Sequence, residues 1–253
     1  MVTADRPLWV RRAVRCFQWQ TWPHRELVVL DDGQEDLSPI LAELPPEQVR
    51  YERLRGPRKP LGALRNLALE LATGDYCIQW DDDDWYHPDR IRVQMRYALM
   101  GYEAVLLGHT LMHLDVPLWR KHPFRAWLPH GTPGTILHRR DLRMRYPEWA
   151  RQEDTAYRDQ WRSRRVRVLG RRYAYLFIRC YHGRNTWDLA HFLVRLRNHP
   201  LGYLAYWYAR LRGSWAHHPA FRLSPQEQLA FAQFERDTQI VRQEHASFYA
   251  GAS

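Results

Sequence analysis

The sequence predicts an α/β fold, in which a mainly parallel, twisted sheet is flanked by helices and followed by a helical C-terminal tail. Three observations lead to this prediction. Short apolar runs alternate with helical patterns through roughly the first 110 residues, acidic residues directly follow two of these runs, and the sequence from Trp187 onward is patterned as helix. Strands that alternate with helices are typical of parallel sheets, because a parallel pair needs a crossover connection, which is usually a helix.

The elements of the first half follow from local patterns. The apolar, β-branched run over 26–30 ends in an Asp-Gly turn, which is typical of a strand. Leu64, Leu67 and Leu71 recur at helical spacing, and Pro88 suits the first position of a further helix. In order, we expect strands over 26–30 and 49–54, a helix over 61–72, a strand over 75–80, a helix over 88–100 and a strand over 104–108.

The second half is less regular, and its patterns predict strands over 135–139 and 173–181 with a helix over 153–162 between them. The helical tail is interrupted near His199-Pro200 and again around His217-His218-Pro219, because proline ends a helix. No linker separates the parts. We therefore expect one catalytic unit over 1–185 and a helical extension over 186–253 that packs on it.

The N-terminal residues have the pattern of a strand that is cut short. Met1-Val2-Thr3 resembles the last residues of a strand that leads into a loop over 4–7. In a parallel sheet of this kind that first strand would be central. We therefore expect translation to start upstream of Met1.

Charge and cysteine content limit the classes of function. The 38 Lys and Arg residues outnumber the 28 Asp and Glu residues, which gives a formal net charge of +10. This balance favours an anionic partner: nucleic acid, an anionic membrane surface or a phosphorylated small molecule. Cys16, Cys77 and Cys180 are odd in number and widely spaced, which excludes a disulfide framework and indicates a reducing compartment. We expect a cytoplasmic protein, since no run is long enough to span a membrane.

The run Asp81–Asp84 directly follows the predicted strand over 75–80. Ligands of open α/β sheets bind at the carboxyl ends of the strands, where this run would lie. Adjacent carboxylates repel one another, and a bound Mg²⁺ or Mn²⁺ would convert that repulsion into attraction. The alternative is a solvated acidic turn that caps the helix opened by Pro88.

Three further sets of residues are candidates for the same site. Asp31 and Asp32 also follow a strand and could accept hydrogen bonds from a base or a ribose, although an Asp-Gly turn explains them too. Glu153 and Asp154 open a predicted helix, where a carboxylate could act as a general base or simply cap the helix. His182 leaves a predicted strand and could contact a metal or a phosphate, or have a structural role.

In order and spacing, these fragments resemble glycosyltransferase family 2, the inverting enzymes with the GT-A fold. The resemblance covers roughly 2–185 and implies the GT-A type of sheet with its first strand truncated. It rests on the opening loop Val2–Pro7, on Gln20–Pro23 and Glu26–Gly33, on Leu61–Asn66, on Ala72–Tyr76, on Trp80–Asp84 in the position of the DxD motif, on His87-Pro88 and on Glu153-Asp154.

The resemblance also implies roles for individual residues. The nucleotide would be held by Thr3, Asp5, Asp31 or Asp32, Arg65, and the first part of the acidic run, Asp81 and Asp82. Asp83 would bind Mn²⁺ or Mg²⁺ that bridges the diphosphate, with Asp81 facing the ribose or the metal. The run of four aspartates leaves that assignment uncertain by one residue. Asp154 would be the general base beside Glu153, and His182 would add a contact to the metal or the diphosphate.

The expected activity is metal-dependent, inverting transfer of a sugar from a nucleotide-sugar donor, with a UDP-sugar as the expected donor, in polysaccharide biosynthesis. The acceptor would be a hydroxyl of a glycan or a lipid-linked molecule. The aromatic and basic segment over 187–212 could contact the anionic inner face of the membrane.

Two alternatives remain. A nucleotidyltransferase would carry a glycine-rich loop near its start, and 4–8 contains no glycine. A nucleic-acid-binding protein would suit the charge but leaves Asp81–Asp84 unexplained, so we expect no nucleic acid as partner.

Overall fold

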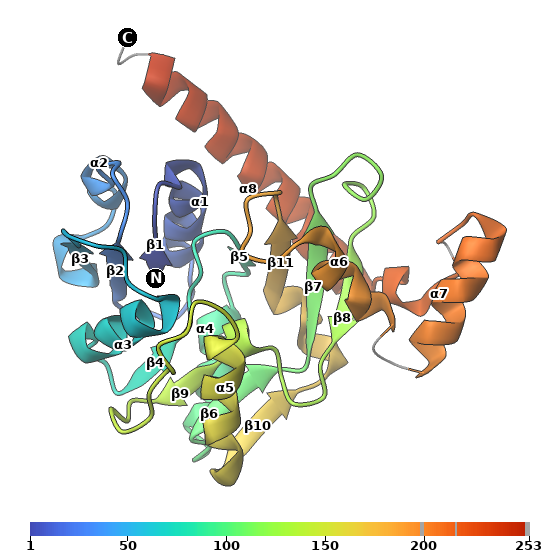
Figure 1. The fold of residues 1–253 in the computed structure, drawn as a ribbon, viewed down its shortest axis with the longest axis horizontal. Coiled ribbons are helices and arrows are strands. Elements are labelled where there is room, and N and C mark those ends of the chain that lie inside the picture. Colours follow the sequence, from blue (N-terminus) through green and yellow to red (C-terminus); the bar gives the residue numbers. More distant parts are fainter. Residues whose placement is uncertain (198–199, 216, 251–253) are drawn as a thin grey trace.

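In a computed structural model of the chain, which describes residues 1–197, 200–215 and 217–250, strands form a central layer with helices packed around it (Figure 1). The predicted α/β class is therefore confirmed. No helix in these ranges is long and apolar enough to cross a membrane.

The N-terminal part forms a parallel three-stranded sheet. β2 (Leu27–Asp31) lies between β1 (Val2–Thr3) and β3 (Val49–Arg53), and Val2 lies opposite Leu30. All five residues of β2 are buried, as its apolar, β-branched sequence predicts. The helices of this part are α1 (Pro7–Gln18), α2 (Ser38–Leu41) and α3 (Leu61–Leu71), with the short 3₁₀ helix η1 (Pro46–Gln48).

Two four-stranded sheets complete the strand layer. The first has the order β10 (Val166–Leu169), β6 (Ala104–Leu107), β9 (Leu137–Arg139), β4 (Tyr76–Ile78), and helix α4 (Arg90–Ala98) packs on it. The second has the order β5 (Trp85–Tyr86), β11 (Phe177–Tyr181), β7 (His109–Leu114), β8 (Phe124–Trp127). β10 and β11 pair in parallel with β6 and β7, whereas β5, β8 and β9 pair antiparallel.

Two predicted strands begin two or more residues later than expected. The predicted strand over 173–181 begins only at Phe177, because Gly170 starts a turn that continues as the 3₁₀ helix η4 (Arg171–Leu176). The predicted strand over 135–139 loses its start to the 3₁₀ helix η2 (Pro133–Thr135). There the Thr135 hydroxyl donates to the Thr132 carbonyl and accepts from the Leu107 N–H, which fixes the turn.

The C-terminal third is helical, as predicted. α5 (Glu153–Gln160) and η3 (Trp161–Ser163) precede β10, and α6 (Leu189–Leu193), η5 (Val194–Arg197), α7 (Pro200–Arg212), η6 (Pro219–Phe221) and α8 (Pro225–Ala250) follow β11. The predicted break at Pro219 is confirmed, and His199 lies outside the described residues. α7 lies to one side of the molecule, whereas α8 runs back past the strands to α1 (Figure 1).

A layer of aromatic rings supports the turn that follows β4. The rings of Trp80 and Tyr86 stack with their centroids 3.8 Å apart. Beneath them the fully buried Arg90 lies 4.6 Å from the Tyr86 ring centre and donates to the Gln79 carbonyl. The Tyr86 hydroxyl accepts from the Asp81 N–H at 2.6 Å and donates to the Asp81 carbonyl at 2.8 Å. The core thus fixes the backbone at the start of the acidic run.

A buried ion pair attaches α8 to the sheet. Arg125 on β8 contacts both carboxylate oxygens of Glu227, and its Nε lies 2.6 Å from Oε1. The two side chains are only 6% and 3% exposed. Removing one member of such a pair leaves the other charge buried without a partner, which destabilises the fold.

We expect Glu227→Gln to lower the Tm by about 6–20 °C, since breaking a buried pair costs about 3–5 kcal/mol and 1 kcal/mol corresponds to about 2–4 °C in a domain of this size. Thermal unfolding followed by circular dichroism measures the shift. The matched control is Glu70→Gln, because the ion pair of Glu70 with Arg145 is about half exposed, with 42% and 44% of the side chains accessible. Equal shifts for both variants would contradict the stabilising role of the buried pair.

Candidate functional site

The turn Asp81–Asp84 lies between β4 and β5, close to the ends of β1 and β11 and the start of α5. Asp82 and Asp84 are buried, whereas Asp81 and Asp83 are partly accessible. The four carboxylates therefore point to different surroundings, and each has its own hydrogen-bond donors.

Asp82 is held by the loop that follows β1. The Thr3 hydroxyl donates to Asp82 Oδ2 at 2.6 Å, and Arg6 Nη1 donates to Oδ1 at 3.2 Å. Burial, together with the neighbouring charge of Asp83, raises the pKa of Asp82 to about 7, despite the opposing charge of Arg6. Asp82 thus links the N-terminal loop to the acidic turn.

Asp83 gathers donors from two distant parts of the chain. Its Oδ2 lies 3.3 Å from Arg6 Nη1, 3.2 Å from His182 Nε2 and 3.1 Å from Asn185 Nδ2. Burial opposes ionisation, but the hydrogen bond from His182 and the charge of Arg6 outweigh it and lower the pKa of Asp83. Asp83 is therefore held as a carboxylate at the surface of the turn.

Asp84 faces the interior. Its Oδ1 accepts a hydrogen bond from the Cys180 N–H at 2.9 Å, which ties the turn to β11. Burial and the charge of Asp83 raise the pKa of Asp84 well above its usual value. This inward position gives Asp84 a structural contact and leaves Asp81 and Asp83 as the partly accessible members of the run.

Asp81 and Glu153 share one arginine. Arg65 on α3 donates from Nη2 to Asp81 at 2.9 Å and from Nε to Glu153 at 3.1 Å. Gln79 also donates to Asp81 at 3.0 Å. Burial raises the pKa of Glu153, although the charge of Arg65 opposes this effect, and the adjacent carboxylates raise the pKa of Arg65 despite its burial. Arg65 therefore joins the acidic turn to the start of α5.

Asp31 is the last residue of β2, and Asp5 lies beside this strand end. Asp31 is fully buried, accepting from the Gly33 N–H and from the Tyr51 hydroxyl, both at 2.9 Å. Asp5, at a positive φ of 54°, accepts from the Gln34 N–H. Asp32 N–H donates to the Thr3 carbonyl, which brings its partly accessible side chain beside the loop after β1.

Asp154 lies in the first turn of α5, which follows Gln152 at a positive φ of 65°. Its carboxylate accepts from the Thr155 N–H at 2.7 Å and remains partly accessible. Asp154 thus differs from Glu153, which is buried against Arg65.

The residues predicted as metal ligands are brought together only in part. Among the described residues, no group of three or more His, Cys, Asp or Glu side chains is arranged to hold a metal ion. Asp83 and His182 are in contact, as the prediction requires, whereas Asp81 is directed to Arg65. In this arrangement the guanidinium of Arg6 bridges Asp82 and Asp83 and supplies the positive charge between them.

The sequence prediction missed Arg6, Gln79 and Asn185 as members of this cluster. Arg6 could have been suspected, because a run of carboxylates needs a nearby cation. Gln79 directly follows β4, and Asn185 lies 102 residues from its partner Asp83, so neither had a local signal.

A family model described as glycosyl transferase family 2 matches residues 1–172. Among curated proteins, an uncharacterized glycosyltransferase of Haemophilus influenzae is 29% identical over 92 residues, which are 36% of this chain and 37% of that protein. The chain spans less than two fifths of the length of the curated relatives it matches, from 17% to 37%.

Two solved structures share the fold. The S. aureus protein TarS, residues 1–349, in complex with UDP-GlcNAc, has a TM-score of 0.58 at 15% identity, with 94% of this chain and 80% of that chain covered. The mannosyltransferase PcManGT from Pyrobaculum calidifontis, in complex with GDP-Man and Mn²⁺, has a TM-score of 0.54 at 13% identity, with 98% and 78% covered. These likenesses confirm the predicted GT-A type of fold.

We expect Arg65→Met to lower the Tm by about 4–16 °C, because it leaves the buried carboxylate of Glu153 without its cation at a cost of roughly 2–4 kcal/mol. Adding Glu153→Gln should recover at least about 1 kcal/mol of this loss, which thermal unfolding of the single and double variants measures. Arg162→Met, with 57% of the side chain exposed, is the control and should change little. Strict additivity of the two changes would refute the coupling.

Proposed function

The chain belongs to glycosyl transferase family 2, and from this premise we propose that it is a metal-dependent, inverting glycosyltransferase. The observation that carries the proposal is the convergence of Asp83, His182 and the Arg65-bridged pair Asp81 and Glu153 around the turn between β4 and β5. These groups come from elements far apart in sequence. Such a cluster of charged, partly buried groups is typical of a binding site rather than of a solvated turn.

We propose that the nucleotide lies over the ends of β1 and β2. Asp31 or Asp32 would face its base or ribose, with Thr3 at the end of β1 and Asp5 in the adjoining loop. A UDP-sugar is the proposed donor, because the solved structure of TarS, which shares the fold, contains UDP-GlcNAc. Arg65 stays beside Asp81 and balances the charge of that carboxylate.

We propose that Asp83 and His182 hold the Mn²⁺ or Mg²⁺, with Asp81 on the ribose or metal side. Their oxygen and imidazole donors suit these ions, and the structure already brings Asp83 Oδ2 and His182 Nε2 within 3.2 Å. A bound divalent ion would neutralise the charge that develops on the departing diphosphate. Arg6 would then exchange its contacts with the two carboxylates for contacts with the diphosphate, since it can bind either anion.

Asp154 is the proposed general base. Its carboxylate is partly accessible, whereas Glu153 is buried against Arg65, so Asp154 is the member of the pair that can reach an acceptor. It would take the proton of the acceptor hydroxyl as that oxygen attacks the anomeric carbon. The nucleoside diphosphate leaves from the opposite face, which inverts the configuration.

We propose the division into a catalytic unit over 1–185 and a helical extension over 186–253, and assign the extension a membrane contact. Leu204, Trp207 and Leu211 on α7 are 66%, 44% and 87% exposed. Arg210 and Arg212 are exposed beside them. An exposed apolar face with neighbouring arginines fits an anionic phospholipid surface, where a lipid-linked acceptor in polysaccharide biosynthesis would be found. This contact would place the protein at the cytoplasmic face of the membrane.

In an assay of nucleotide release from a panel of UDP-, GDP-, TDP- and CDP-sugars, we expect turnover with one donor class only when Mn²⁺ or Mg²⁺ is present. Asp154→Asn should reduce kcat by about 10²–10⁴-fold, the usual contribution of a general base, and change the dissociation constant of the donor less than about threefold. Asp83→Asn should abolish metal-dependent release. Asp159→Asn, at the far end of the same helix, is the control. Full turnover of Asp154→Asn, or metal-independent turnover of the unchanged protein, would contradict the assignment.

In liposome flotation, we expect the protein to rise with vesicles containing phosphatidylglycerol and to stay behind with pure phosphatidylcholine. Replacing Leu204, Trp207 and Leu211 together by serine should reduce the bound fraction at least about tenfold, since each buried apolar side chain contributes about 1.5–3 kcal/mol. Leu229→Ser on α8, at a position 71% exposed, should have no effect. Equal loss in both variants, or no binding of the unchanged protein, would refute the membrane contact.

A further inference from the structure

Helix α8 presents one buried face to α1 and to residues of the sheet. Phe234, Asp237 and Val241 recur at the spacing of three to four residues that brings side chains onto one side of a helix, and they are 2%, 7% and 2% exposed. Thr238 lies beside them and is partly accessible. Asp237 differs from its neighbours on this face, because a carboxylate is rarely buried unless it has a specific partner.

The partner of Asp237 is the residue that directly follows the acidic turn. The Trp85 indole N–H donates to Asp237 Oδ2 at 2.9 Å, and Trp85 is fully buried in β5. The Phe234 ring contacts the same indole edge-on, with the ring centres 6.3 Å apart. Burial raises the pKa of Asp237, although the hydrogen bond from Trp85 opposes this effect. The end of the acidic turn is thus attached to α8 by a buried hydrogen bond and a ring contact.

Thr238 is connected to the turn through Arg12 of α1. Arg12 Nη2 donates to the Asp83 carbonyl, and Nη1 donates to the Thr238 hydroxyl at 3.3 Å. The guanidinium also lies 5.4 Å from the centre of the Phe234 ring. Arg12 is buried, so these contacts determine where its charge lies. The backbone of the proposed metal ligand Asp83 is therefore held by a cation that α8 positions.

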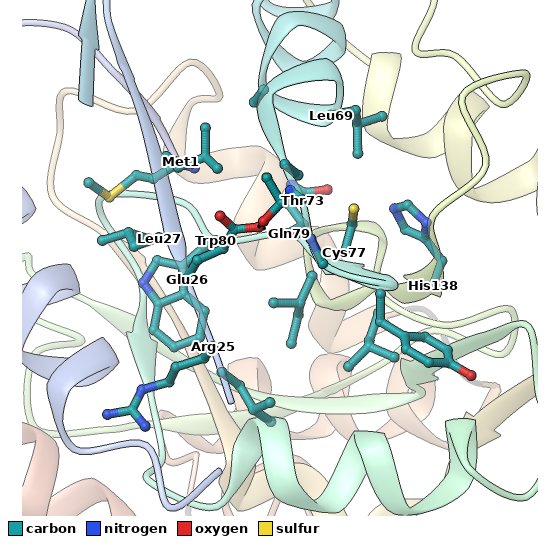
Figure 2. A pocket seen from close by; sticks show the side chains of 18 of the residues that line it. Met1, Arg25, Glu26, Leu27, Leu69, Thr73, Cys77, Gln79, Trp80 and His138 are labelled. Carbon is teal, nitrogen blue, oxygen red and sulfur yellow. Dashed lines mark hydrogen bonds between the residues drawn. The ribbon is translucent and has the colours of Figure 1, made fainter. Parts of the chain in front are cut away.

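The residues that precede the turn lack close packing on one side. Gln79 and Trp80 line a cavity of about 590 Å³, and Figure 2 shows Met1 and Leu27 beside them. Voids of this size are unusual in protein interiors, and a side chain beside one loses contacts on that side. Trp80 depends on its remaining contacts, among them the bond from its indole N–H to the Ala13 carbonyl of α1 at 3.2 Å. Helix α1 therefore holds the start of the turn as well, and α8 packs on α1.

We propose that Asp237 and Thr238 are positioning residues of the acidic turn, so that α8 sets the geometry in which Asp83 binds its metal ion. They act through Trp85 and Arg12 rather than by contact with the donor. The inference rests on the proposed function for the identity of the ligand. It adds α8 to the elements that build the site, although this helix lies beyond the residues that the family model matches.

Loss of either contact should displace the turn and leave the chain folded. Without the Asp237 carboxylate, the buried N–H of Trp85 has no acceptor, and the backbone beside it can relax only by moving the turn. Without the Thr238 hydroxyl, Arg12 loses one of the groups that hold it against the Asp83 carbonyl. A divalent ion needs oxygen donors at set distances, so a small displacement of the turn lowers the affinity for the ion.

The test measures the dissociation constant of Mn²⁺ in the presence of UDP, from the electron paramagnetic resonance signal of free Mn²⁺. Asp237→Leu, which removes the acceptor, should raise this constant at least about tenfold. Tenfold corresponds to about 1.4 kcal/mol, within the roughly 1–3 kcal/mol that an unpartnered buried donor costs. Thr238→Val should raise the constant at least about threefold. Asp237→Asn and Thr238→Ser keep an oxygen acceptor and should stay within about twofold of the unchanged protein.

Glu227→Gln is the matched control for a purely structural role of α8. Glu227 lies on the same helix and contacts Arg125 and Ser224 rather than the turn. The substitution should lower the Tm, as argued above, and leave the dissociation constant of Mn²⁺ within about twofold. If α8 only stabilised the fold, the loss of Mn²⁺ affinity would follow the loss of Tm in all variants.

Hydrogen exchange of the Asp81 and Cys180 amides, measured without metal or nucleotide, tests the inference apart from the proposed function. Both N–H groups make hydrogen bonds within the turn or to it. We expect Asp237→Leu to speed their exchange at least about tenfold and Glu227→Gln to leave it unchanged.

Unchanged exchange in Asp237→Leu would overturn the proposal, and so would equal losses of Mn²⁺ affinity in Asp237→Leu and Glu227→Gln. Failure of the unchanged protein to bind Mn²⁺ with UDP would refute the proposed function alone. The exchange rates would then decide whether α8 positions the turn.

Discussion

Four consecutive carboxylates can share one turn only if each has its own donors, because two unit charges 4 Å apart repel by about 1 kcal/mol in water and about 4 kcal/mol near a protein surface. The turn Asp81–Asp84 meets this constraint by dividing the charges. Arg65 holds the first carboxylate, Thr3 the second and His182 the third, while the fourth faces the Cys180 N–H in the interior. The donors lie on different elements, so the turn depends on the packing of the whole unit.

The core beneath the turn determines where it lies. Trp80 precedes the acidic run in the sequence and Tyr86 follows it, and their rings stack on each other. Arg90 packs against both rings. The two hydrogen bonds between the Tyr86 hydroxyl and the Asp81 backbone then fix the start of the run. Hydrophobic packing thus positions charged groups that would otherwise separate, and the energy of the core stabilises the geometry of the site.

The N-terminal strand β1 and the loop after it also position the acidic turn. Thr3 at the end of β1 and Arg6 in the loop that follows it both contact the acidic turn. The same loop borders Asp31 through the pairing of Thr3 with that residue. Both sides of the proposed donor site therefore depend on the position of one short strand.

Local sequence pattern determined the α/β class and the strands that begin at residues 27, 49, 76 and 104. It also placed Asp81–Asp84 at the end of a strand. Runs of apolar residues and helical spacing are local properties, so they can be read from the sequence. No element was predicted for α1, since its arginines hide its apolar face, and the strands β5, β7, β8 and β10 were also missed. Only the tertiary structure decided that β5, β8 and β9 pair antiparallel. It alone brought Arg6 and Asn185, 77 and 102 residues away in sequence, to Asp83. Such contacts have no local signal, because they arise from which distant strand ends the packing places side by side.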